Sequence, residues 1–165
     1  MEQQNYHPIP QPDEIPIRER EDAMGAYFMM FASLAGGIPF PLINLIASFI
    51  YYFLNKSKSR FVHFHSHQSL TSQIPVSVLN AIAIVWGILL IVNNFHITRD
   101  FITYLIAIGI VNLVYFIFSI IAAVKARKGK FYYFIFFGKW AYHVAYKIKD
   151  QKLSSENINK PPKGF

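Results

Sequence analysis

Three long stretches without any Asp, Glu, Lys or Arg constrain the fold of this chain more than any other feature. They cover residues 23–55, 61–98 and 101–124. Only 15% of the 165 residues are charged, whereas a soluble domain averages roughly 25%. Mean hydropathy is positive, at +0.28. Because so few charges cannot cover a water-facing surface, we predict an all-α protein that crosses a membrane several times.

Two of these stretches each predict one spanning helix. Phe101–Val124 has 24 residues, and at roughly 1.5 Å per residue it reaches about 36 Å, enough to cross a hydrocarbon core of about 30 Å. Within the second stretch, the apolar part is Ile74–Val92. It has Pro75 in its first turn, where proline is well accommodated, and it ends before Asn93.

The first stretch admits two interpretations. Residues 24–54 are too many for one span and few for two, and Gly36-Gly37-Ile38-Pro39-Phe40-Pro41 interrupts them. One interpretation is a hairpin or re-entrant pair of two helices, about Met24–Ala35 and Pro41–Leu54, joined by a tight turn, and the other is one long broken helix. With the hairpin, residues 23–130 form a transmembrane domain with a bundle of about four membrane helices.

Basic residues predict the orientation. Lys56, Lys58 and Arg60 precede the span that starts at Ile74, and a cluster of bases at 125–130 follows the last span. The loop between the two spans carries a single base. Since Lys and Arg accumulate on the cytoplasmic side, we expect both basic loops, and with a hairpin both termini, to be cytoplasmic.

The two tails differ in charge. Residues 1–22 hold six acids, two bases and four prolines, which predicts a disordered acidic arm. Residues 131–150 predict an amphipathic interfacial helix with Lys139, His143 and Lys147 on one face, although a fourth short span is an alternative. Residues 151–165 predict a flexible basic tail.

Ten bases against two acids in residues 125–165 predict a partner for this end of the chain. Beside a membrane span, such charge favours anionic lipid headgroups over nucleic acid. The residues that we expect to contact headgroups are Lys125, Arg127, Lys128, Lys130, Lys139 and Lys147.

A few polar residues lie inside the apolar stretches. Asn112 is at the midpoint of its span, Asn80 shares a face with Ser77 and Gly87, and Asn44 follows the Gly/Pro break. One interpretation is helix packing through side-chain hydrogen bonds. The other is the polar lining of a pathway. No acid or base lies within a predicted span, so an ion pump is not expected.

Signals for an enzyme or a metal site are weak. His63 and His67 are four residues apart and could share a helix face, with His65 pointing elsewhere, but the chain has no Cys and no acid lies near. Phosphate loops, nucleophile elbows, zinc-protease helices and dinucleotide fingerprints are not found. We therefore expect no enzymatic activity, no cofactor and no metal.

Three short motifs carry a family resemblance. The segment Arg60–Leu70 resembles the Phe-Val-Arg-Phe-His-Ala-x-Gln-Ala signature of the family that contains the Tic inner-envelope import component of chloroplasts and its small bacterial relatives. Ala122–Lys130 is similar to that family's span-ending motif, and Pro41-Leu42-Ile43 matches more weakly. The matching positions are Phe61, Phe64, His65, Gln68, Leu70 and Gly129.

The resemblance implies a compact four-helix membrane domain with His65 and Gln68 at a cytoplasmic helix start. Chloroplast members are proposed to form part of an import channel. Because the chain shows no transit peptide, the resemblance implies a bacterial inner-membrane protein.

Three functional hypotheses follow from these patterns. The leading one is a non-enzymatic subunit that packs against other integral membrane proteins in protein translocation or envelope assembly. The second is a channel or carrier for a polypeptide or small solute, and the third is a sensor of anionic lipid surfaces.

Overall fold

The computed structural model describes residues 6–32, 41–93 and 96–148. In these residues the chain forms helices and a single isolated β-bridge between Tyr6 and Lys147. The helices are η2 (Pro12–Glu14), α1 (Ile17–Phe28), η3 (Met29–Phe31), α3 (Pro41–Asn55), α4 (Arg60–Val92), α5 (Arg99–Arg127) and α6 (Phe137–Tyr146). The predicted all-α class is confirmed for the described residues.

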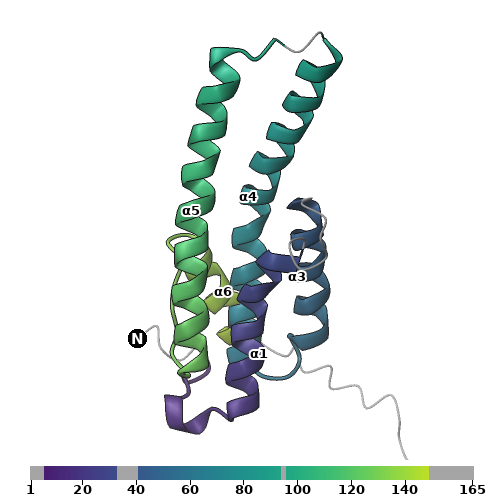
Figure 1. Cartoon of the computed structure of the whole chain (residues 1–165). Coiled ribbons are helices and arrows are strands. Elements are labelled where there is room, and N and C mark those ends of the chain that lie inside the picture. Colours follow the sequence, from purple (N-terminus) through teal and green to yellow (C-terminus); the bar gives the residue numbers. More distant parts are fainter. Residues whose placement is uncertain (1–5, 33–40, 94–95, 149–165) are drawn as a thin grey trace, which may run out of the picture.

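Two long helices, α4 and α5, form an antiparallel hairpin (Figure 1). They have 33 and 29 residues and are apolar enough to cross a membrane. Each begins at a side-chain cap, because Ser59 Oγ accepts a hydrogen bond from the Val62 amide and Thr98 Oγ1 accepts one from the Phe101 amide, both at 3.2 Å. The two spans expected from the sequence, Ile74–Val92 and Phe101–Val124, lie within these helices.

The expected bundle of about four membrane helices is wrong. In the described residues, only α4 and α5 have the length and composition of a span. At 15 residues α3 is short, and the 12-residue α1 begins among charged residues. Lengths of roughly 22 and 18 Å at 1.5 Å per residue fall below the roughly 30 Å of a hydrocarbon core.

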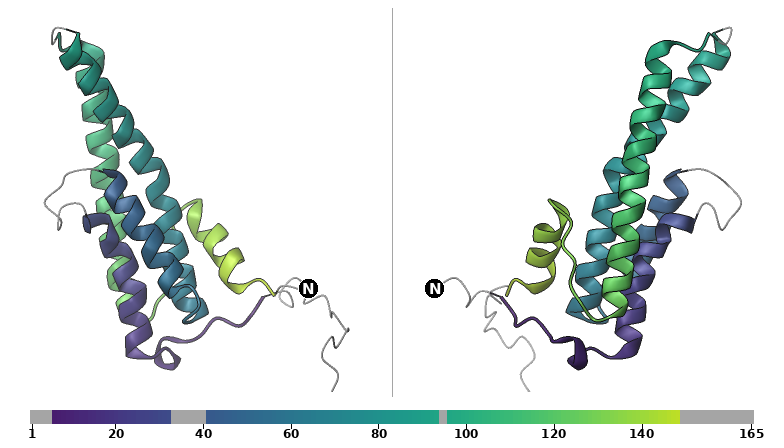
Figure 2. Two further views of the ribbon diagram at one scale, coloured as in Figure 1. Left: turned by 90° about the vertical axis from the view of Figure 1, so that its right-hand side faces the viewer. Right: turned by 60° about the vertical axis from the view of Figure 1, so that its left-hand side comes forward.

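Helices α1 and α3 pack beside one half of the α4–α5 hairpin (Figures 1 and 2). They are separate helices in contact with one another, so the alternative of one long broken helix does not describe this segment. The Gly36–Phe40 part of the break, and the end of the helix expected over Met24–Ala35, lie in residues 33–40, outside the described part. The pair of helices α1 and α3 reaches only about the middle of α4, where Leu42 lies beside Val78 and Ile82.

The molecule therefore has a packed half and a bare half. In the packed half, α1, α3, α6 and the end of α5 enclose the first turns of α4. Every residue from Phe61 to Gln73 is buried there except the half-buried His63. In the bare half, the last turns of α4 and the facing part of α5 extend beyond the other described helices and pack against each other, for example through Trp86 and Phe101 (Figure 2).

Small residues bring the helices of the packed half together. One core cluster joins α1, α4 and α5, and a second joins α4 and α6 through Phe64, Ala141, Ala145 and Tyr146. Alanines occupy the contact points in both clusters, which allows close approach of the backbones. The first cluster consists of Ile15, Ala23, Tyr27, Phe61, Ala122, Ala123 and Ala126.

The acidic arm predicted to be disordered is helical in part. Residues 12–14 form η2, and α1 begins at Ile17, inside the predicted arm. Ile15 is buried, and two of the acids that suggested disorder have basic partners. Asp22 pairs with Lys58 at 2.8 Å and Glu21 pairs with Arg127. Long-range pairing of this kind cannot be read from the composition of the arm alone.

The helix predicted over residues 131–150 is shorter than expected. Residues 131–136, here called the strap, form a non-helical connection, and α6 covers only Phe137–Tyr146. Ala141 and Ala145 on α6 are buried against the packed half instead of facing lipid. Gly138 permits this approach, because a Cβ there would lie 2.7 Å from the Tyr133 Cα. Residues 149–150 are outside the described part.

Candidate functional site

His65 and Gln68 form the centre of a buried hydrogen-bond network. Gln68 Nε2 donates to the Tyr27 hydroxyl and to the Tyr132 carbonyl, both at 2.9 Å. Gln68 Oε1 accepts from the Phe134 amide at 3.1 Å. The Tyr27 hydroxyl lies 2.9 Å from His65 Nδ1. The side chain of Gln68 thus links α4 to both α1 and the strap.

Aromatic rings enclose His65. The ring centroids of Phe61 and Phe64 lie 4.5 and 4.9 Å from the His65 centroid, and that of Phe131 lies at 5.8 Å. The Tyr27 hydroxyl accepts from Gln68, and when it donates its own proton to His65 Nδ1 the imidazole proton lies on Nε2. Among the described residues, His65 Nε2 has no hydrogen-bond partner. A neutral imidazole in an apolar cage serves as a cross-link between helices.

The remaining two motif positions lie apart from this network. Leu70 is buried in the same stretch of α4. Gly129 ends α5 with a φ of +69°, and two hydrogen bonds of 2.9 Å close the turn, from the Lys130 amide to the Lys125 carbonyl and from the Gly129 amide to the Ala126 carbonyl. This pattern is a Schellman motif, which requires the left-handed conformation that glycine adopts easily.

A second polar cluster joins α4 and α5 between the predicted spans. Asn80 Nδ2 donates to Asn112 Oδ1 at 3.0 Å, and Asn112 Nδ2 donates to Asn80 Oδ1 at 3.1 Å. Each amide also donates to a carbonyl of its own helix, Val76 or Ile108, at 2.8 Å. The two side chains therefore satisfy one another within the hairpin.

A small polar cavity of about 60 Å³ adjoins this pair. It has room for a few water molecules. The structure brings four of the five predicted polar residues to its wall, while Gly87 lies apart, against the ring of Phe101. The lining residues are Met30, Asn44, Gln73, Val76, Ser77, Asn80, Asn112 and Tyr115.

The predicted headgroup residues have different surroundings. Lys125 Nζ lies 5.8 Å from the centroid of the Tyr132 ring, and Arg127 pairs with Glu21. The backbone of Lys147 forms the bridge with Tyr6. Lys128, Lys130 and Lys139 are exposed. The acidic residues of α1 thus neutralise part of the basic end.

The histidine run is used for packing in the described structure. His63 Nε2 lies 3.1 Å from the Tyr52 hydroxyl, and the His67 ring meets Trp140 edge-on at a centroid distance of 4.9 Å. His65 belongs to the network with Tyr27. Across the described ranges, no group of three or more His, Cys, Asp or Glu residues could hold a metal ion.

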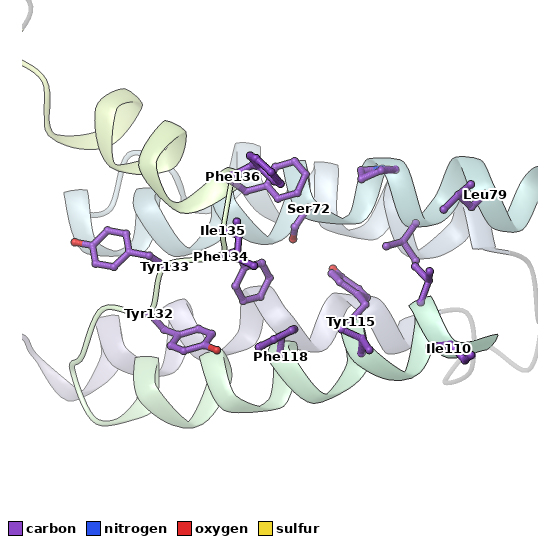
Figure 3. A pocket seen from close by; sticks show the side chains of 15 residues that line it. Ser72, Leu79, Ile110, Tyr115, Phe118, Tyr132, Tyr133, Phe134, Ile135 and Phe136 are labelled. Carbon is purple, nitrogen blue, oxygen red and sulfur yellow. The ribbon is translucent and has the colours of Figure 1, made fainter. Parts of the chain in front are cut away.

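An apolar groove of about 480 Å³ lies between α4 and α5, on the side covered by the strap (Figure 3). Ser72, Pro75, Val76 and Leu79 of α4 line one wall, and Ile110, Val111, Val114, Tyr115 and Phe118 of α5 line the other. Residues 132–137 close one end. A shallower hollow of about 600 Å³ between α3 and α4 is lined by Leu42, Val78, Ala81, Ile82, Val85, Trp86 and Leu89.

Sequence reasoning missed several of these features. Tyr27 gave no signal, because a lone tyrosine in an apolar stretch has no recognisable spacing. The strap carried a signal in its run of aromatic residues, but that run was assigned to a helix. The Ser48–Gln73 hydrogen bond, between α3 and α4, was also missed.

Comparison with known proteins identifies a family. Residues 21–141, from α1 to the middle of α6, match the model of the magnetosome magnetite crystal formation protein family. No curated protein and no solved structure matches the chain. The resemblance to the Tic import family is therefore wrong. The residues that carried it, such as Phe61, His65 and Gln68, are packing residues of the buried network, and short motifs of that kind do not identify a family.

Proposed function

The chain belongs to the magnetosome magnetite crystal formation protein family, and from this membership we propose that it is a non-enzymatic accessory protein of the membrane that encloses such crystals. It is a membrane protein with two helices long and apolar enough to span. Its task in this proposal is to pack among other integral membrane proteins and organise them, and a protein-translocation role is not part of it.

The bare half of the hairpin carries this proposal. Val85, Ile88, Val92, Ile102 and Ile106 are each about half exposed or more. They belong to the end of the α4–α5 hairpin that extends beyond the other described helices, and Leu42 of α3 reaches only the edge of this part, at Ile82. Apolar surface of this extent on a spanning hairpin requires lipid or another membrane helix as its neighbour.

The polar clusters support packing over catalysis. The His65–Gln68–Tyr27 network and the Asn80–Asn112 pair consist of neutral groups bonded to one another. Neither cluster contains a carboxylate that could orient or activate a base. A pathway for solutes is also less well supported, because the two central amides are occupied by their mutual hydrogen bonds.

Crosslinking from the bare half tests the proposal. A photoreactive residue at Val85 or Ile106 of the tagged full chain should capture a stoichiometric membrane protein in a magnetite-forming host, whereas the same residue at His96, at the exposed end of the loop, should not. Deleting the gene from that host should change the number or size of the crystals. If the chain elutes alone in mild detergent and the deletion leaves the crystals unchanged, the proposal fails.

A second candidate function is contact with an anionic lipid surface at the packed end. Lys128, Lys130 and Lys139 are exposed there, in the same region as Phe136 at 81% and Trp140 at 53% exposure. Exposed bases beside exposed aromatic residues are typical of the headgroup region. Replacing the three lysines by Gln in the full chain should weaken enrichment of anionic lipid around it in mixed-lipid nanodiscs. Enrichment that does not respond to salt would contradict this function.

A further inference from the structure

The groove between α4 and α5 is an intramembrane feature. Its walls come from residues 72–79 of α4, which begin two residues before the predicted span, and from residues between Ile110 and Phe118 on α5, which lie within the other predicted span. Figure 3 shows these side chains facing the space between the two helices, with the strap across one end. At roughly 1.5 Å per residue, the eight α4 residues cover about 10 Å of depth in one leaflet.

The strap leaves apolar side chains uncovered at the groove. Ile135 and Phe136 line it and are about four-fifths exposed. Their carbon surface has no partner among the described residues and lies where lipid chains are available. An apolar occupant from the bilayer would cover it without dehydrating any charged group.

One cation stands at the closed end. Lys125 Nζ lies 5.8 Å above the ring of Tyr132, which lines the groove. Among the described residues no carboxylate pairs with Lys125, whereas Lys58 and Arg127 have Asp22 and Glu21. An apolar groove, with a lysine that lacks a carboxylate partner beyond the Tyr132 ring at its closed end, matches the two parts of an anionic phospholipid.

We propose that this groove holds one acyl chain of an anionic phospholipid whose phosphate group contacts Lys125. This inference rests on the membrane location in the proposed function. The volume of about 480 Å³ lies within the range of roughly 300–1,000 Å³ for small-molecule sites. A transmembrane helix, roughly 10–12 Å across with its side chains, is too wide to enter the groove.

The headgroup provides the selectivity. An acyl chain moves from bilayer to groove without leaving an apolar environment, so the groove alone discriminates little between lipids. A lysine near the membrane surface favours an anionic lipid by about 1 kcal/mol, which corresponds to about a five-fold preference. We therefore expect phosphatidylglycerol to be retained about five-fold more strongly than phosphatidylcholine.

Native mass spectrometry of the detergent-solubilised full chain tests the site. The wild type, titrated with phosphatidylglycerol or phosphatidylcholine of matched chains, should retain one phosphatidylglycerol. Lys125→Gln should abolish the five-fold preference, and Val114→Phe, which fills the groove from an exposed position, should abolish retention of either lipid. The matched controls are Lys56→Gln, whose Nζ also lies over an aromatic ring, that of Phe53 at a centroid distance of 4.1 Å, and Val85→Phe, in the hollow on the α3 side. Both should behave as wild type.

Every outcome of this experiment decides the inference. Equal retention of the two lipids, or retention that Val114→Phe leaves intact, overturns it. A second copy of the chain bound in place of lipid, and lost in Val114→Phe, assigns the groove to a protein interface and also overturns it. Circular dichroism of each variant confirms that it is folded. Because the measurement uses the isolated protein, its result is independent of the crosslinking and crystal readouts that test the accessory function.

Discussion

Asn80 and Asn112 exchange a reciprocal pair of side-chain hydrogen bonds, 3.0 and 3.1 Å long, between the two long helices. The second proton of each amide is bonded to a carbonyl of its own helix. The pair lies where the packed half ends and the bare half begins. It is therefore a polar cross-link at the level where the hairpin loses the support of α1 and α3.

Replacing one asparagine should lower the free energy of unfolding by more than half of what replacing both asparagines does. Asn80→Leu leaves the Asn112 amide without its partner, and interhelical hydrogen bonds in membranes are worth about 0.6 kcal/mol on average and up to about 1.7 kcal/mol. The double variant with Asn112→Leu removes both polar groups and should destabilise the protein by less than the sum of the single variants. Unfolding by SDS in mixed micelles measures these free energies.

Asn93→Leu is the matched control, since Asn93, at the exposed end of α4, donates through Nδ2 to the Leu89 carbonyl of its own helix and to no other described residue. It should change the free energy of unfolding little. A double variant whose cost equals the sum of the single costs would show that the two amides are not coupled.

Gln68 should hold the strap against α4. In Gln68→Leu, the Phe134 amide and the Tyr132 carbonyl lose their partner, and unsatisfied buried groups cost about 1–3 kcal/mol. Hydrogen exchange at the Phe134 amide should accelerate accordingly. Thr103→Val, which removes a hydroxyl bonded only to the Arg99 carbonyl of its own helix, should leave exchange at Phe134 unchanged. Unaltered exchange in Gln68→Leu would contradict this role.

The sequence predicts the membrane parts of this fold well and the packed half poorly. The spans Ile74–Val92 and Phe101–Val124 were predictable because apolar length is a local property. The hydrogen bonds between Asn80 and Asn112 fit the helix-packing interpretation of these residues, but the polar-pathway interpretation was also open. A single sequence does not give the relative rotation of the two helices.

The packed half depends on contacts between distant residues. Residues 17–22 read as a disordered arm because their acids lie far in sequence from their partners Lys58 and Arg127. The aromatic run 131–136 has the composition of an interfacial helix, but Gln68 takes up the Phe134 amide and the Tyr132 carbonyl and so stabilises a non-helical path. The number of membrane helices was overestimated, because a charge-free stretch need not cross the membrane.

Two glycines should respond in opposite directions to the same substitution. Gly129→Ala places a Cβ at a φ of +69°, 3.1 Å from the Pro12 Cα, and should destabilise the protein by about 1–2 kcal/mol. Gly109→Ala adds a methyl group to an exposed position of α5 with nothing within 4 Å, and should stabilise it by up to about 1 kcal/mol. The difference is measurable by unfolding in detergent, and a shift of the same sign in both variants would contradict the assignment of the turn.

Tyr146 should make stability sensitive to alkaline pH. Its hydroxyl is buried with no hydrogen-bond partner in the described part of the chain, and burial raises the pKa of Tyr146 above its ordinary value of 10. Below that value both states keep the proton. As the pH rises above it, the unfolded state loses the proton first, so stability falls.

Tyr146→Phe should remove this loss and also an unsatisfied hydroxyl, so its unfolding free energy should equal or exceed that of the wild type by about 1 kcal/mol at neutral pH. Thermal unfolding in detergent at about pH 7 and about pH 11 measures both effects. Tyr142→Phe, on the same helix, is the control. A pH dependence that Tyr146→Phe leaves unaltered would show that the hydroxyl is not the responsible group.

The half-length hairpin of α1 and α3 should be visible in cysteine labelling, because the chain has no native cysteine. Ser57→Cys, between α3 and the start of α4, and Lys130→Cys, after the end of α5, lie at the packed end, whereas His96→Cys lies in the connection between α4 and α5 at the opposite end. A membrane-impermeant maleimide should therefore label the first two from one side of sealed vesicles and His96→Cys from the other.

Leu42→Cys, beside Val78 and Ile82 in the middle of a span, should be labelled from neither side until detergent is added. Labelling of Leu42→Cys from the His96 side would mean that α3 crosses the membrane, and labelling of Ser57→Cys and Lys130→Cys from opposite sides would overturn the hairpin topology itself.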